Sequence, residues 1–271
     1  MRILLCTDGS PEAAKAARFG MLIARDSNEP IALLGVVERR PDTDQMHTAF
    51  EALGAELQSI GAQCEVKLRH GYAAEQILNE AEEWHADLIV IGQLGQRGLT
   101  RFLIGGTASR IVQYAPCSVL LVKGERSALR KILVCTAGGA PGLHDVEMAG
   151  RVAQQARASV TVLHVMSQVP VSEDAYLPDL AATADDLMAR HTREGVHLRW
   201  ALETLKARAP DSQAKVRHGF VIDEILAELR GGDYDLLVVG AHIARGLTRW
   251  LLDDVTAHLL EEAHVPVLVA R

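Results

Sequence analysis

The sequence is poor in aromatic residues and in cysteines. Aromatic side chains make up 4% of the 271 residues, so the core must consist mainly of Val, Ile, Leu and Ala. Such cores are typical of parallel sheets covered by helices, whose strands are short aliphatic runs. The four cysteines form no CxxC pair and no disulfide-scaffold spacing, and three of them lie in aliphatic runs. We therefore expect buried, reduced thiols in a cytoplasmic protein.

The sequence also lacks a basic run and a long apolar stretch. Its formal net charge is −7, so it has no electrostatic footprint of the kind that nucleic-acid-binding proteins carry. No apolar stretch is long enough to span a bilayer. The first one, Ile3–Cys6, is interrupted at once by Asp8, unlike the apolar region of a signal peptide. We therefore expect neither nucleic acid nor a membrane as a partner.

An internal duplication organises the chain. The segment 87–103 (DLIVIGQLGQRGLTRFL) is repeated as 235–251 (DLLVVGAHIARGLTRWL). The first strands also match, Ile3–Thr7 with Ile132–Thr136, but at a smaller offset. The second half must therefore carry an insertion, which we place within about 167–213. A repeat of this length indicates two copies of one structural unit in a single polypeptide.

Each half alternates short aliphatic strands with helices. The predicted strands are 2–6, 31–37, 63–69, 87–92 and 118–123 in the first half, and 131–135, 159–166, 214–218, 235–239 and 266–270 in the second. Strands that alternate with helices pair in parallel through right-handed crossovers. The fold class is therefore α/β, with two tandem doubly wound five-stranded parallel sheets of strand order 3-2-1-4-5. We place the domains at 1–124 and 130–271, joined by a short polar linker.

The insertion has two parts of different character. Residues 172–194 are polar and rich in Asp and Ala, whereas Val196–Ala209 has the pattern of a helix. The polar part either covers the sheet or presents a surface to a partner, and both readings stay open.

Glycines gather where a ligand is expected in such a sheet. Ligands bind at the carboxyl ends of the strands where the winding reverses, here the loops that begin at Thr7 and Gly92. Further glycines follow Gly92, and Gly105-Gly106-Thr107 opens a helix. The stretch is neither a Walker A motif nor a GxGxxG fingerprint. Glycines still let the backbone approach a ligand, and a helix N-terminus favours a phosphate.

This stretch resembles the universal stress protein family, whose ATP-binding members carry G-x2-G-x9-G-Ser/Thr. Gly92, Gly95 and Gly105 match its glycines, and Ile3–Ser10 resembles the family's opening strand and Asp-Gly-Ser turn. The segment Ala115–Val122 resembles the closing strand. One departure is that Gly106 stands where the family has Ser or Thr, so that Thr107 would supply the hydroxyl from the next position.

The resemblance implies an adenine nucleotide alpha hydrolase-like fold that binds ATP or ADP in the first half. Cys6 and Val36 would line the adenine pocket, and Asp8 would face the ribose and phosphates and hold Mg²⁺ only through the nucleotide. The implied nucleotide-binding residues are Cys6, Thr7, Asp8, Val36, Gly92, Gly95, Gln96, Arg97, Gly98, Gly105, Gly106, Thr107 and Ala108. Arg97 recurs as Arg245, so a structural role for it is an equal alternative.

The second half has lost this pattern. Ile243 replaces the second glycine, Asp253-Asp254 replaces Gly105-Gly106, and Ala137 replaces Asp8. Carboxylates at a helix N-terminus are stabilising there, and they would repel a phosphate. We therefore predict that bulk and negative charge fill the second site, which keeps the fold without binding a nucleotide.

Three functions follow from these observations. The leading one is a stress-response protein that binds ATP or ADP as a regulatory ligand. A slow ATPase and a nucleotide-independent interaction module are the alternatives, and no residue near the glycine loop is an evident catalytic base. By analogy with family dimers, Val119–Val122 and Val267–Ala270 would pair the halves into a pseudo-dimer. A homodimer and an unidentified protein partner stay open.

Overall fold

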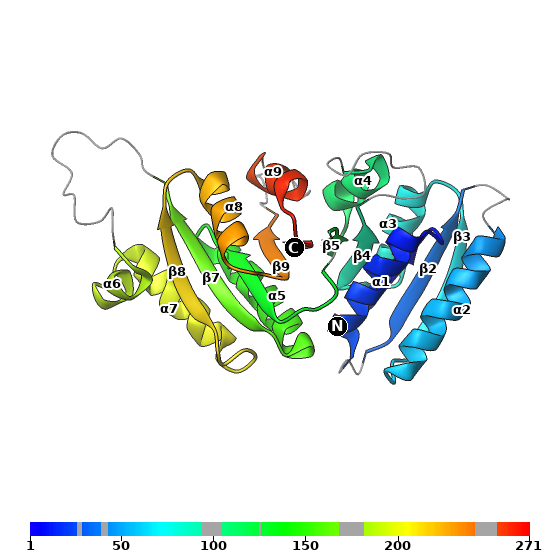
Figure 1. The fold of residues 1–271 in the computed structure, drawn as a ribbon, viewed down its shortest axis with the longest axis horizontal. Coiled ribbons are helices and arrows are strands. Elements are labelled where there is room, and N and C mark those ends of the chain that lie inside the picture. The colour runs from blue at the N-terminus through cyan, green and yellow to red at the C-terminus, as the bar shows by residue number, and fades with distance from the viewer. Residues whose placement is uncertain (26–28, 39–42, 94–103, 125, 168–181, 242–253) are drawn as a thin grey trace.

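The computed structural model describes residues 1–25, 29–38, 43–93, 104–124, 126–167, 182–241 and 254–271. The first half contains β1 (Ile3–Thr7), α1 (Pro11–Ala24), β2 (Ile31–Val37), α2 (Thr43–Ser59), β3 (Cys64–His70), α3 (Ala73–Glu83), β4 (Leu88–Gly92), α4 (Gly106–Tyr114) and β5 (Ser118–Val122). The second half contains β6 (Lys131–Cys135), α5 (Gly139–Ala156), β7 (Ser159–Met166), α6 (Ala184–Ala189), α7 (Arg193–Leu205), β8 (Gln213–His218), α8 (Val221–Gly231), β9 (Leu236–Gly240), α9 (Asp254–Glu262) and β10 (Val267–Ala270). Figure 1 shows the two halves side by side.

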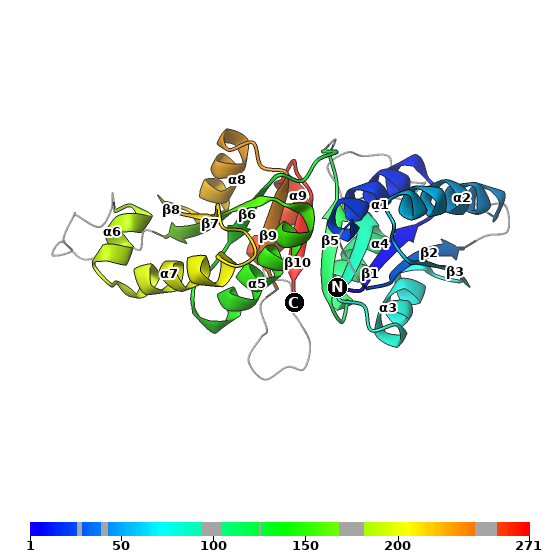
Figure 2. The same ribbon diagram turned by 90° about the horizontal axis from the view of Figure 1, so that it is seen from below.

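The described strands form one continuous sheet in the order β3-β2-β1-β4-β5-β10-β9-β6-β7-β8. Each half has the predicted order 3-2-1-4-5, with parallel pairing between its described strands. The halves join through β5 and β10, which pair antiparallel with Leu120 opposite Leu268. Figure 2 shows these two strands side by side at the centre. The closing strands therefore pair across the two halves, as the resemblance implied.

Aliphatic side chains cover both faces of the sheet. Successive residues of a strand point to opposite faces, so Leu5 packs under α1 while Leu4 belongs to the layer beneath α3 and α4. The helices α1, α2, α5 and α7 cover one face, and α3, α4, α8 and α9 cover the other. Because both faces are buried, the strands read as continuous apolar runs rather than alternating ones.

In the residues that the structure describes, the insertion adds the short helix α6. Residues 184–189 fold as α6, whose Leu187 is buried and which packs beside α7 and β8. The predicted helix 196–209 begins earlier, at the capping residue Thr192, and its last residue is Leu205. The covering role proposed for the polar region thus holds for α6, whereas 168–181 lie outside the described residues.

Candidate functional site

The turn after β1 is built by side chains that hold their own backbone. The Thr7 hydroxyl accepts a hydrogen bond from the N–H of Gly9, and Asp8 Oδ1 accepts one from the N–H of Ser10 at 2.9 Å. Ser10 then caps α1 through the N–H of Ala13, and Pro11 is the first helical residue. Gly9 has a φ of +82°, a conformation that favours glycine. The turn therefore places the half-buried Asp8 carboxylate at the carboxyl end of β1.

The start of α4 is bonded to the end of β4, the strand beside β1. Gly105 is the N-cap, and it has no side-chain capping hydrogen bond; its N–H donates to the Gln93 carbonyl at 3.0 Å. Gly106 and Thr107 are exposed, and the first turn contains no acidic residue. A side chain added at Gly106 would meet nothing within 4 Å. Open space beside the N–H groups of a helix start is suited to a phosphate group.

The neighbouring strand ends supply an apolar wall. Cys6 and Val36 are both buried, at 5% and 6% exposure, and β1 lies between β2 and β4. Burial raises the pKa of the Cys6 thiol far above its ordinary value, with smaller contributions from Cys117 and Glu80. Cys6 therefore remains a protonated thiol, and it can line a pocket but not act as a nucleophile.

The structure brings part of the predicted site together. Cys6, Thr7 and Asp8 come from β1 and its turn, Val36 and Gly92 from the ends of β2 and β4, and Gly105 to Ala108 from the start of α4. Gly95, Gln96, Arg97 and Gly98 lie outside the described residues.

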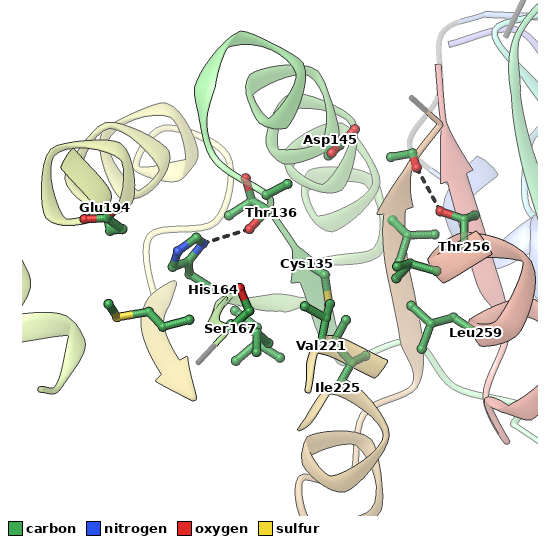
Figure 3. A pocket seen from close by; sticks show the side chains of 17 residues that line it. Cys135, Thr136, Asp145, His164, Ser167, Glu194, Val221, Ile225, Thr256 and Leu259 are labelled. Carbon is green, nitrogen blue, oxygen red and sulfur yellow. Dashed lines mark hydrogen bonds between the residues drawn. The ribbon is translucent and has the colours of Figure 1, made fainter. Parts of the chain in front are cut away.

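The second half has a pocket of about 410 Å³ at the equivalent position (Figure 3). Cys135, Thr136 and Ala137 line it from β6 and its turn, in place of Cys6, Thr7 and Asp8. Ala137 stands uncharged in place of Asp8, and Ile243, which was expected to add bulk here, lies outside the described residues. A cavity is thus present at this position, and the chemistry of its lining bears on what it could hold.

Acidic groups surround the second pocket. Asp145 of α5 stands where α1 has the buried Ala16, and its carboxylate lies against β9, 2.4 Å from where a Cβ of Gly240 would be. Asp254 opens α9 in place of Gly106. Glu194 also lines the pocket, and no lysine or arginine does so among the described residues. The described lining is therefore acidic, and carboxylates repel the oxygens of a polyphosphate.

Two histidines beside this pocket were not predicted from the sequence. His197 Nε2 lies 2.7 Å from the Thr136 hydroxyl, and His164 Nδ1 donates to the Thr136 carbonyl at 3.0 Å. Burial, and then the nearby His164, lowers the pKa of His197, which favours its neutral form. The only available signal was the position of His164 at a strand end. The His197 contact joins α7 to the turn after β6, and the His164 contact joins β7 to it. In the first half, Gln45 of α2 donates to the Gly9 carbonyl.

Comparison with known proteins agrees with this architecture. The model of the universal stress protein family matches residues 1–123 and again 128–271. A universal stress protein of Mycobacterium tuberculosis is 28% identical over 298 residues, covering 99% of this chain and 96% of that protein. One of Methanocaldococcus jannaschii is 28% identical over 138 residues, covering 45% of this chain and 81% of that protein.

A solved structure shows the same fold over the whole length. The crystal structure of a universal stress protein from Archaeoglobus fulgidus has a TM-score of 0.68 at 19% identity, covering 100% of this chain and 98% of that one. In the part of the chain that the structure describes, no helix is both long and apolar enough to cross a bilayer. Because the family model matches both halves in tandem, the chain belongs to the universal stress protein family.

Proposed function

We propose that this tandem universal stress protein is a cytoplasmic stress-response protein that binds ATP or ADP as a regulatory ligand in its first half only. The observation that carries the proposal is the contrast between two equivalent helix starts. α4 opens with Gly105-Gly106, without a side-chain cap and with open space beside it, whereas α9 opens with an acidic first turn. A helix start attracts a phosphate in the first case and repels it in the second.

The other first-half residues fit a nucleotide in the same arrangement. Cys6 and Val36 would contact the base, and Asp8 would face the ribose, with Mg²⁺ accompanying the phosphates. No three His, Cys, Asp or Glu side chains gather into a metal site among the described residues. Any metal held by Asp8 would therefore depend on the nucleotide, which completes its coordination with phosphate oxygens.

Gly106→Asp tests the site directly. It copies the second half's acidic residue onto α4, where a carboxylate favours the helix start, so the protein should fold normally. We expect ATP and ADP to bind at least about tenfold more weakly, a loss of about 1.4 kcal/mol, in isothermal titration calorimetry. Gly54→Asp in α2 is the matched control, because a side chain there also meets nothing within 4 Å. Unchanged affinity in Gly106→Asp would show that the site is wrongly placed.

Mass spectrometry of ligand released from the purified protein separates the functional classes. Bound ATP supports a regulatory ligand, and ADP with phosphate release supports a slow ATPase. A protein that contains no nucleotide and takes none up supports the interaction module.

A further inference from the structure

A cavity of about 420 Å³ lies at the seam between the two halves, apart from both strand-end sites. The end of α1, residues 127–130 of the linker and the end of α5 line it. The helices α1 and α5 pack against each other here. Each helix starts at the carboxyl end of the strand before it and runs antiparallel to that strand. The last turns of α1 and α5 therefore lie at the amino ends of the strands. We call this space the seam cavity.

Positive charge is concentrated at the seam cavity. Arg25, Arg130 and Arg157 line it from three different segments, and its described lining contains no aspartate or glutamate. The chain as a whole has a net charge of −7, so the described lining of the cavity differs in sign from the whole chain. Guanidinium groups from several directions match the oxygens of a phosphate or carboxylate.

A structural explanation accounts for only part of this cluster. Arg25 and Arg157 follow the last residues of α1 and α5, where the helix dipole favours a cation. Arg157 also has another interaction. Arg130 caps no helix. Its N–H donates to Asp235, and its carbonyl accepts from the N–H of Ser159 at 2.9 Å, so its backbone is fixed at the lining of the cavity while the residue stays exposed.

A fourth group restricts the chemical class of the ligand. Gln155 lines the cavity, and its Oε1 is buried without a hydrogen-bond partner in the described part of the chain. An unsatisfied buried acceptor is costly, and turning the Gln155 carboxamide toward a ligand hydroxyl in the cavity would remove that cost. The cavity therefore suits a ligand that has anionic oxygens for the arginines and an O–H donor for Gln155.

We propose that the seam cavity binds a phosphate group, either as hydrogen phosphate or as a hydroxyl-bearing phosphomonoester. Hydrogen phosphate carries both anionic oxygens and an O–H, and the volume leaves room for an esterified small molecule. Since Arg25 belongs to the first half and Gln155 and Arg157 to the second, the ligand would contact both halves. Binding there would stabilise their association. This site is independent of the proposed nucleotide site.

Titration calorimetry at low ionic strength tests the proposal, with inorganic phosphate and glycerol 3-phosphate as separate probes. The background is Gly106→Asp, which removes the α4 phosphate site. We expect at least one probe to bind, and Arg130→Gln to weaken it at least about tenfold. Arg151→Gln is the matched control, because Arg151 is on α5 but contacts Asp87 outside the cavity. The better probe distinguishes free phosphate from an ester.

Sulfate tests the hydroxyl requirement, since near neutral pH it carries no proton. In the Gly106→Asp background the protein should prefer phosphate to sulfate, and the added Gln155→Met change should abolish that preference while the protein still folds, as judged by its thermal unfolding. The proposal is overturned if neither probe binds, if Arg151→Gln weakens binding as much as Arg130→Gln, or if phosphate binds only when Gly106 is intact. Nucleotide binding measured in the Gly106→Asp series reports on the first-half site separately.

Discussion

At the scale of single residues, the duplication has kept two buried carboxylates that serve structure. Glu80 in α3 and its repeat equivalent Glu228 in α8 are each 3% exposed. Glu80 forms salt bridges with Lys67, at 2.8 Å, and with Arg69, both from the edge strand β3. Glu228 forms salt bridges with two cationic side chains of β8 in the same way. These pairs persist in both halves while the residues at the strand ends diverge, so they belong to the fold rather than to a ligand site.

The first prediction concerns Glu80 and pH. Burial opposes its ionisation, but hydrogen bonds from Lys67 and Arg69 outweigh that effect and lower its pKa. Because the folded-state pKa is lowered, this carboxylate stabilises the fold at pH values above its unfolded-state pKa of about 4.3. That stability is lost as the pH falls through the folded-state pKa. Glu80→Gln should lower the free energy of unfolding by about 2–3 kcal/mol at neutral pH and by less in acid.

Urea unfolding at neutral and acidic pH measures this difference. Glu83→Gln is the control, since Glu83 also contacts Arg69 but its side chain is 64% exposed. An equal loss at both pH values would contradict the electrostatic account.

At the scale of elements, α6 distinguishes the two edge strands. It covers one face of β8, where His218 donates to the Ala182 carbonyl at 3.0 Å and Thr183 and Asp186 form a capping box. The corresponding face of β3 is contacted by α2 and by no second helix among the described residues. Its Val66 and Leu68 are 51% and 39% exposed. The insertion thus changes an edge of the sheet, not its topology.

The second prediction follows from the burial of Leu187, the apolar anchor of α6. Leu187→Ala should cost about 2–3 kcal/mol, because it removes a fully buried side chain. Hydrogen exchange should then accelerate in α6 and β8 while β3 is unaffected. Val196→Ala in α7 is the comparison, since that side chain is 53% exposed. Equal acceleration in both edge strands would show that α6 does not act locally.

At the scale of the whole molecule, each half caps a helix of the other. Lys123, which follows β5, donates to the carbonyls of Leu260 and Glu261 at the end of α9. Arg271, which follows β10, donates to the carbonyls of Val112 and Ala115 at the end of α4. Both cations are buried, and burial lowers the pKa of Lys123 to about 8. These crossed contacts make the two halves one packing unit.

The third prediction tests whether the two halves unfold as one unit. Lys123→Ala leaves carbonyls of α9 without their donor and should lower the free energy of unfolding by about 2 kcal/mol. Because β5 and β10 share the interface, exchange protection should fall in both strands. Lys206→Ala, at a side chain that is 75% exposed, should change little. Loss of protection in β5 alone would mean that the halves unfold independently.

The sequence by itself determined the repeated strands and helices and their order, and it predicted where the first-half site lies. Short aliphatic runs specify buried strands, and the repeated segments show that the second half follows the same path. The sequence also showed that glycines open α4 and that Asp254 opens α9. The chemistry of a helix end depends on adjacent residues, so it can be predicted from the sequence.

The tertiary structure alone decided what distant segments build together. Arg25, Arg130 and Arg157 meet only because α1, the linker and α5 converge at the seam. α6 is too short for a periodic pattern to identify. The pocket that survives in the second half also depends on packing between helices and strand ends, which no local pattern encodes. Contacts across long sequence separations arise when strands and helices pack, and for that reason only the folded chain could show them.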